Sequence, residues 1–171
     1  INGKKVTVFS IFHPENKVLE GQDQLPNEQI VTQRLEERGA VVQHIEISSD
    51  WPFTHFRDDI YPSCLDSEYV FINFFVVPSF AIGTLVPPIN AMRLFYMGVL
   101  SQAKNVVITS FGDPWVFVNF QPAPTYLCTF DPTPNSQEVA VKAWFGEQKV
   151  RGRMPVSLKH CFARGDGIDL N

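Results

Sequence analysis

Glu68-Tyr69-Val70-Phe71-Ile72-Asn73-Phe74-Phe75-Val76-Val77 is the stretch of sequence that decides the fold. Almost all of its residues are apolar, and most of these are aromatic or β-branched, which is typical of a β-strand. An apolar run without polar alternation is typical of a strand buried on both faces, as in a parallel sheet. We therefore expect a central strand here, with helices covering both sides of the sheet.

The segments on either side of this run predict alternating strands and helices. Residues 41–47 alternate in polarity, which favours a strand near the edge of the sheet. The alternation of strands with helices predicts right-handed crossovers and a mostly parallel, doubly wound sheet. The predicted fold class is α/β, a three-layer α/β/α sandwich of the flavodoxin-like kind. Besides the central run, the predicted strands are 4–11, 41–47, 106–111 and 126–130, and the predicted helices are 27–38, 53–60, 89–103 and 136–145.

The last twenty or so residues differ from the rest in composition. The segment from Met154 to Leu158 is extended in pattern, and few apolar residues follow it. We expect an extra edge strand at the C-terminus and then a loose end. The predicted organisation is one α/β sandwich domain at 1–158 and a C-terminal tail at 159–171.

Length and charge exclude several classes of protein. A chain of 171 residues is long enough to bury one ordinary core. Its net charge is −4 and its fourteen basic residues are scattered, which argues against a nucleic-acid partner. The longest apolar run, 69–77, is interrupted by Asn73 and closed by Pro78, so we expect no membrane span. The chain begins with Ile1, and we interpret it as a processed product or a piece of something longer.

The cysteines and histidines give no pattern typical of a disulfide or metal site. Cys64, Cys128 and Cys161 are far apart and odd in number, which predicts neither a disulfide framework nor a metal site. His160 and Cys161 are adjacent rather than spaced as metal ligands. No glycine-rich phosphate loop follows any predicted strand. We therefore expect no metal and no cofactor, and the lack of a disulfide pattern favours a cytoplasmic location.

Ligands of parallel sheets bind at the carboxyl ends of the strands. Among the loops that follow the predicted strands, Gly112-Asp113-Pro114-Trp115 is the strongest candidate for a binding site. A tryptophan face beside a carboxylate could contact a sugar. The alternative is a simple turn with Trp115 packed inside. Phe117 and Phe120 follow closely; together with Trp115 they are candidates for an exposed interface, the alternative being that they line the core. Asp113, Trp115, Phe117 and Phe120 are thus the candidate residues for a substrate cleft or an interface.

A catalytic pair of carboxyl groups is a further hypothesis. Retaining glycosidases need two carboxyls about 5 Å apart, and inverting ones need a wider spacing. Asp113 and Asp131 both follow predicted strands and could face one site. Asp131 precedes Pro132, however, so the alternative is that it forms a turn or caps the next helix.

Several short motifs occur in the order found in one known domain. They are Phe111-Gly112-Asp113-Pro114, Ala123-Pro124-Thr125-Tyr126, Thr133-Pro134-Asn135-Ser136-Gln137, Phe145-Gly146-Glu147 and Gly152-Arg153-Met154-Pro155-Val156-Ser157. With these motifs the chain resembles the C-terminal α/β sandwich domain of glycoside hydrolase family 3, in its β-N-acetylglucosaminidase or β-hexosaminidase branch. The resemblance is clearest over 106–158, and Met154 stands where the family usually has leucine, a volume-conserving change. It implies an accessory domain of a larger glycosidase.

The resemblance implies a parent enzyme that removes terminal β-linked N-acetylglucosamine by a retaining mechanism. In that branch the nucleophile and the Asp-His acid/base pair belong to an N-terminal catalytic barrel, so no catalytic residue is carried over to this chain. In β-glucosidase relatives the corresponding domain supplies an acid/base glutamate, but no motif here assigns that role. The expected partner is the barrel: the domain is expected to pack against it, to shape the rim of its cleft or to aid assembly. Carbohydrate and further copies of the chain are the other partners considered.

Two alternatives to this accessory role stay open. One is an independent α/β module that binds a small ligand or a protein at its strand ends. The other is an autonomous hydrolase that uses Asp113 and Asp131.

Overall fold

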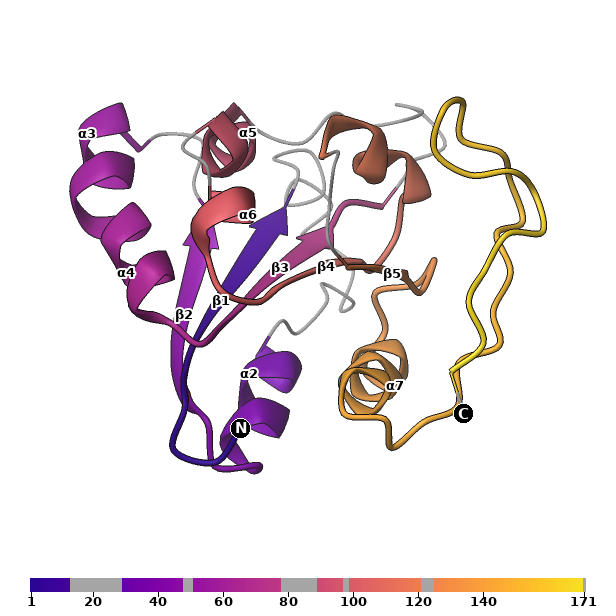
Figure 1. The fold of residues 1–171 in the computed structure, drawn as a ribbon, viewed down its shortest axis with the longest axis horizontal. Helices are drawn as coiled ribbons and strands as arrows, with labels where there is room; N and C mark the ends of the chain where they lie inside the picture. Colours follow the sequence, from indigo (N-terminus) through magenta and orange to yellow (C-terminus); the bar gives the residue numbers. More distant parts are fainter. Residues whose placement is uncertain (13–28, 48–50, 78–88, 97–98, 121–124, 171) are drawn as a thin grey trace, which may run out of the picture.

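The computed structural model describes residues 1–12, 29–47, 51–77, 89–96, 99–120 and 125–170. Five parallel strands form one sheet in the order β2-β1-β3-β4-β5, as Figure 1 shows. The predicted central strand is β3, and the predicted edge strand β2 lies at one end of this sheet. The strands are β1 (Lys5–Phe12), β2 (Val41–Ile47), β3 (Tyr69–Phe75), β4 (Val106–Ser110) and β5 (Tyr126–Cys128).

Helices cover both faces of the sheet, which confirms the predicted α/β fold class. One core lies under α2 (Gln29–Glu36) and α7 (Pro134–Trp144) and includes Phe71 and Phe75 of β3. The other core includes Ile72 and Phe74, whose side chains lie on the opposite face of the same strand. Residues of η1 (Phe56–Ile60), α4 (Tyr61–Asp66), α5 (Ile89–Tyr96) and α6 (Val99–Gln102) pack in this core, and the short helix α3 (Phe53–His55) precedes η1.

Residues 53–66 form a longer helical segment than the sequence predicts. The predicted helix is 53–60, ending before Pro62, but α4 continues from η1 through this proline. The reason is that η1 is a π-helical turn, in which the N–H of Tyr61 donates to the carbonyl of Phe56 five residues earlier. This wider turn accommodates a proline, which has no N–H to offer.

The helix before β2 agrees with the prediction where it is described. Val31 and Leu35 are its buried residues, and Gly39 ends the segment with a φ of +81°, the left-handed conformation that glycine adopts readily at a helix C-terminus. The first two residues of the predicted helix 27–38 lie outside the described residues.

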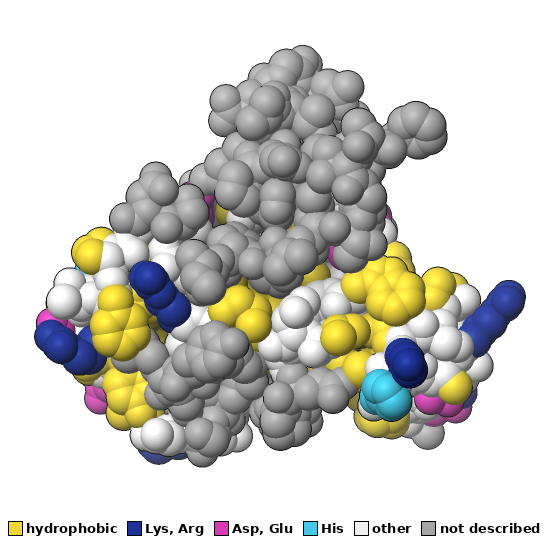
Figure 2. All heavy atoms as spheres, turned by 90° about the horizontal axis from the view of Figure 1, so that it is seen from above, with side chains coloured by type: hydrophobic (Ala, Val, Ile, Leu, Met, Phe, Trp, Pro, Cys, Tyr) yellow, Lys and Arg dark blue, Asp and Glu magenta, His cyan; other side chains and the backbone are white. Residues whose placement is uncertain are grey.

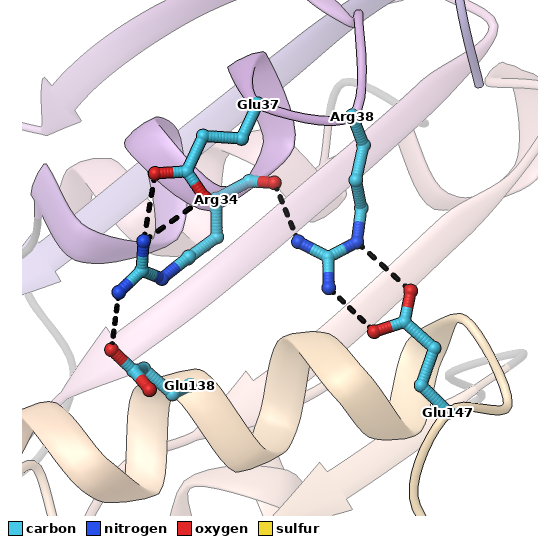
Figure 3. Close-up of polar contacts among 5 residues, drawn as sticks. All are labelled: Arg34, Glu37, Arg38, Glu138 and Glu147. Carbon is cyan, nitrogen blue, oxygen red and sulfur yellow. Dashed lines mark hydrogen bonds and ion pairs between the residues drawn. The ribbon is translucent and has the colours of Figure 1, made fainter.

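Two arginines of the α2 segment connect it to α7 (Figure 3). Arg34 Nη2 lies 2.5 Å from Glu138 Oε1, and Arg38 Nη2 lies 2.6 Å from Glu147 Oε2. The guanidinium of Arg38 also lies over the ring of Phe145, 5.1 Å from its centroid. Because the earlier arginine pairs with the earlier glutamate, the two helices run in the same direction. Exposed pairs of this kind add little stability, so their main effect is to fix the relative position of the helices.

Residues 150–170 form an arm of two antiparallel segments (Figure 1, yellow) rather than an edge strand. Val150 pairs with Leu170 and Leu158 pairs with Phe162, both antiparallel, and among the described residues the arm pairs with no strand of the sheet. This corrects the predicted extra strand. Hydrogen bonds also cross the predicted domain boundary after Leu158, and the Phe162 ring packs 4.9 Å from that of Phe117.

Within the described ranges, no helix has the length and apolar character that crossing a membrane requires.

Candidate functional site

The loop after β4 is fixed against the end of β3 by its backbone. The N–H of Asp113 donates to the carbonyl of Val76 at 2.8 Å. Gly112 makes this approach possible, because a Cβ atom at that position would lie 2.3 Å from the Val76 oxygen. The loop therefore starts at the carboxyl ends of the two central strands, where ligands of parallel sheets bind.

Asp113 is fully buried and serves mainly as a helix cap. Its Oδ1 accepts a 2.8 Å hydrogen bond from the N–H of Trp115 at the start of the 3₁₀ helix η2 (Pro114–Asn119). Its Oδ2 has no hydrogen-bond partner in the described part of the chain. Burial raises the pKa of the Asp113 carboxyl, and the hydrogen bond from Trp115 opposes part of that rise.

The three aromatic candidates lie in different environments. Trp115 is 38% exposed, and Val118 on the same short helix is 49% exposed. Phe120 is fully buried 4.6 Å from the ring of Phe74, and Phe117 is 8% exposed and 4.5 Å from the ring of Tyr126. The expectation that these two phenylalanines are exposed is therefore wrong, because η2 turns them into the core; the alternative core role is confirmed.

Two residues of β5 contact the backbone of this loop. The sequence analysis does not predict these contacts. The Tyr126 hydroxyl donates to the carbonyl of Pro114 at 3.2 Å, and the Cys128 thiol lies 4.0 Å from the carbonyl of Gly112. Burial raises the pKa of the Cys128 thiol to about 11. A thiol with this pKa is protonated at neutral pH, so Cys128 is not an activated nucleophile.

Asp131 is engaged in a turn that leads into α7. Its carboxylate accepts from the N–H and the hydroxyl of Thr133 at 3.0 and 2.7 Å, and from the Ser136 hydroxyl at 2.8 Å. Partial burial tends to raise the pKa of Asp131, but these hydrogen bonds outweigh it and the net pKa is lowered. Of the two alternatives for Asp131, the turn is confirmed, whereas the N-cap residue of α7 is Thr133.

Other places where chemistry could occur offer less. In the described ranges no three His, Cys, Asp or Glu side chains come together in a way that could hold a metal ion. A surface hollow of about 380 Å³ is lined by residues 157–163 at the tip of the arm, and neither Asp113 nor Trp115 contributes to it. The described site thus consists of a buried carboxyl and a half-exposed tryptophan beside it.

Comparison with known proteins finds similarity only at the level of structure. No family model matches the sequence, and no curated protein matches it either.

Three solved structures share the fold. A fungal multi-domain GH3 β-N-acetylglucosaminidase with a GCN5-related glucosamine N-acetyltransferase region superposes with a TM-score of 0.70 and 18% identity, over 98% of this chain and 17% of that one. A GH3 β-N-acetylglucosaminidase from Paenibacillus sp. str. FPU-7 superposes with a TM-score of 0.62 and 13% identity, over 86% of this chain and 26% of that one. The β-glucoside phosphorylase BglX bound to 2FGlc superposes with a TM-score of 0.63 and 16% identity, over 90% of this chain and 26% of that one.

The chain therefore has the fold of a part of these three proteins, and two of them are GH3 β-N-acetylglucosaminidases, as the sequence resemblance predicts. It spans only 17% to 26% of the lengths of those chains, which fits one domain of a larger protein. At identities of 13% to 18% the likeness defines the fold, whereas function depends on the site.

The close approach at Gly112 can be tested by adding a methyl group. Gly112→Ala should destabilise the chain by about 1–3 kcal/mol, the usual cost of overpacking, because the new Cβ would meet a backbone oxygen that cannot move aside. The control is Gly152→Ala, where an added Cβ meets nothing within 4 Å. Urea unfolding measures both variants, and equal stability of the two would contradict the geometry.

The two aspartates should influence stability in opposite directions with pH. The folded-state pKa of Asp113 is raised, so its contribution to stability is fully present below the unfolded pKa and is lost as pH rises through the folded pKa. The folded-state pKa of Asp131 is lowered, so its contribution is present above the unfolded pKa and is lost as pH falls through the folded pKa.

Asparagine at each position isolates these contributions. From acid to neutral pH, Asp113→Asn should gain stability relative to the natural chain, and Asp131→Asn should lose it. Unfolding free energies measured between about pH 3 and 7, around the ordinary aspartate pKa, check this expectation. Slopes of the same sign for both variants would contradict the described environments.

Proposed function

We propose that this chain is a non-catalytic accessory domain of a larger glycoside hydrolase of family 3, of the β-N-acetylglucosaminidase type. The carrying observation is that 98% of the chain superposes on 17% of a fungal enzyme of that kind. The order of motifs over 106–158 supports the same assignment to the C-terminal α/β sandwich domain.

The environments of Asp113 and Asp131 support the absence of catalysis in this chain. A glycosidase needs one carboxyl that gives a proton and a second that attacks or activates water, both facing the substrate. Asp113 is fully buried and caps a helix, and Asp131 accepts three hydrogen bonds from its own turn. Neither carboxyl is free to face a glycosidic bond, so catalysis is assigned to another part of the parent protein.

The exposed side of η2 is the surface best suited to contact that part. Trp115 and Val118 are both apolar and more than one-third exposed on one short helix, at the carboxyl end of the sheet. Figure 2 looks onto this end of the molecule, where hydrophobic side chains lie on both sides of the grey atoms. Exposed apolar side chains that lie together favour a contact with another protein surface.

The accessory role predicts where hydrolysis occurs. The 171-residue chain alone should not release the chromophore from a chromogenic β-N-acetylglucosaminide, whereas the longer parent protein should. Both proteins are assayed at equal molar concentration, with the chain carrying Asp113→Asn as a further control. Turnover by the chain that is lost in this variant would contradict the proposal and place catalysis at Asp113.

A second candidate, an independent module that binds a small ligand at the strand ends, is favoured by the buried carboxyl of Asp113 next to Trp115. Trp115→Ala separates the candidates. For an accessory domain, this variant should weaken binding to the separately prepared catalytic part at least tenfold, and the natural chain should not bind N-acetylglucosamine. Calorimetric titration measures both affinities. Sugar binding that is lost in the variant would instead support the independent module.

A further inference from the structure

Three polar side chains form a row across the buried sheet. Ser10, Asn73 and Thr109 are register partners on β1, β3 and β4, and all three are fully buried. Their chain neighbours two positions away, such as Phe71 and Phe75, belong to the core beneath α2 and α7. Because side chains alternate along a strand, the polar row faces these two helices.

Most polar atoms of this row lack a protein partner. The Ser10 hydroxyl lies 2.8 Å from His44 Nε2 on β2. The side-chain oxygen and nitrogen of Asn73 and the hydroxyl oxygen of Thr109 have no hydrogen-bond partner in the described ranges. Buried polar groups in folded proteins are almost always hydrogen-bonded, to protein or to ordered water.

A fourth buried polar side chain lies on α7, one of the two helices that cover this face of the sheet. Gln137 is fully buried; its Nε2 donates to the carbonyl of Pro132 at 2.9 Å, and its Oε1 has no partner among the described residues. Gln137 therefore presents its amide oxygen as an unpaired acceptor, while one of its two N–H donors binds Pro132.

The position of Trp144 places Gln137 along the sheet. The Trp144 ring lies 4.6 Å from that of Phe71. Gln137 lies seven residues earlier in the chain, which is about 10 Å along a helix. The helix runs toward the amino ends of the strands, since Glu147 pairs with Arg38 just before β2. Asn73 lies two residues beyond Phe71, or about 7 Å toward the carboxyl end, so Gln137 lies at the level of the polar row.

Stacked phenylalanines separate this row from the carboxyl end of the sheet. The ring centroids of Phe12 and Phe75 are 5.1 Å apart, and those of Phe75 and Phe111 are 4.9 Å apart, with both pairs stacked. These rings follow the polar row by two residues on β1, β3 and β4. The polar atoms are thus closed off on that side by an apolar layer.

We infer that Asn73, Thr109 and Gln137 form an internal binding site for an ordered water molecule, which connects α7 to the two central strands. Water matches the available atoms, because it can donate to the Asn73 and Gln137 oxygens while accepting from the Asn73 amide or the Thr109 hydroxyl. These three side chains carry no formal charge, so the site takes a neutral guest rather than an ion. This inference is independent of the proposed enzymatic context.

The sign of a stability change tests the site. Thr109→Val removes one hydroxyl and preserves side-chain shape. If water binds there, the variant removes a hydrogen bond and the thermal midpoint falls; without water, it removes an unpaired hydroxyl and the midpoint rises. The matched control is Thr7→Val, also fully buried, whose hydroxyl lies 2.8 Å from that of Ser67 and whose loss should lower the midpoint.

A high-resolution crystal structure of the chain decides the question directly. We expect one water within hydrogen-bond distance of the Asn73 amide and Gln137 Oε1, and its loss in an Asn73→Leu variant. Magnetic relaxation dispersion of the natural chain should count the same molecule as a long-lived internal water. An Asn73 amide bonded only to protein atoms, or a raised midpoint for Thr109→Val, would overturn the inference.

Discussion

Burial of β3 on both of its faces is the constraint on which the rest of the structure depends. A parallel sheet has no hairpins, so each strand must be followed by a crossover, and the crossover helices must cover both faces. From Val70 to Val76 every residue of this segment is buried. The two cores, the direction shared by α2 and α7, and the location of the candidate site at the carboxyl ends all follow from this arrangement.

The same arrangement determines what the Asp113 loop can do. Gly112 brings the backbone after β4 against the backbone after β3, and Asp113 then turns inward to cap η2. A carboxyl used in this way supports structure rather than reaching a substrate. Trp115 and Val118 remain on the outside of η2, so the surface of this loop is suited to packing against another part of a protein. The accessory role proposed for the chain is consistent with this division between a structural interior and an apolar exterior.

Residue patterns alone predict much of the fold but little of the site. The apolar run of β3, the alternation of β2 and the glycine stop after α2 are local signals, and all three are found in the structure. The end of the helix at 53–60 is mispredicted because a π turn, which has no clear sequence signal, lets the helix continue past Pro62. The burial of Phe117 and Phe120 depends on the direction in which η2 leaves β4, and the pairing of Arg38 with Glu147 depends on helix packing. Asn73 is a buried polar residue that the sequence marks, as an interruption of an apolar run.

The central claim is that this chain packs through η2 on the catalytic part of a larger glycosidase. Hydrogen exchange measured on the chain alone and within the longer parent protein tests it most directly, because exchange reports local protection of backbone amides. The account predicts that the amides of residues 115–119 exchange more slowly in the parent, while those of β2, at the opposite edge of the sheet from β5, serve as an internal comparison. Equal exchange of the η2 amides in both proteins would contradict the claim.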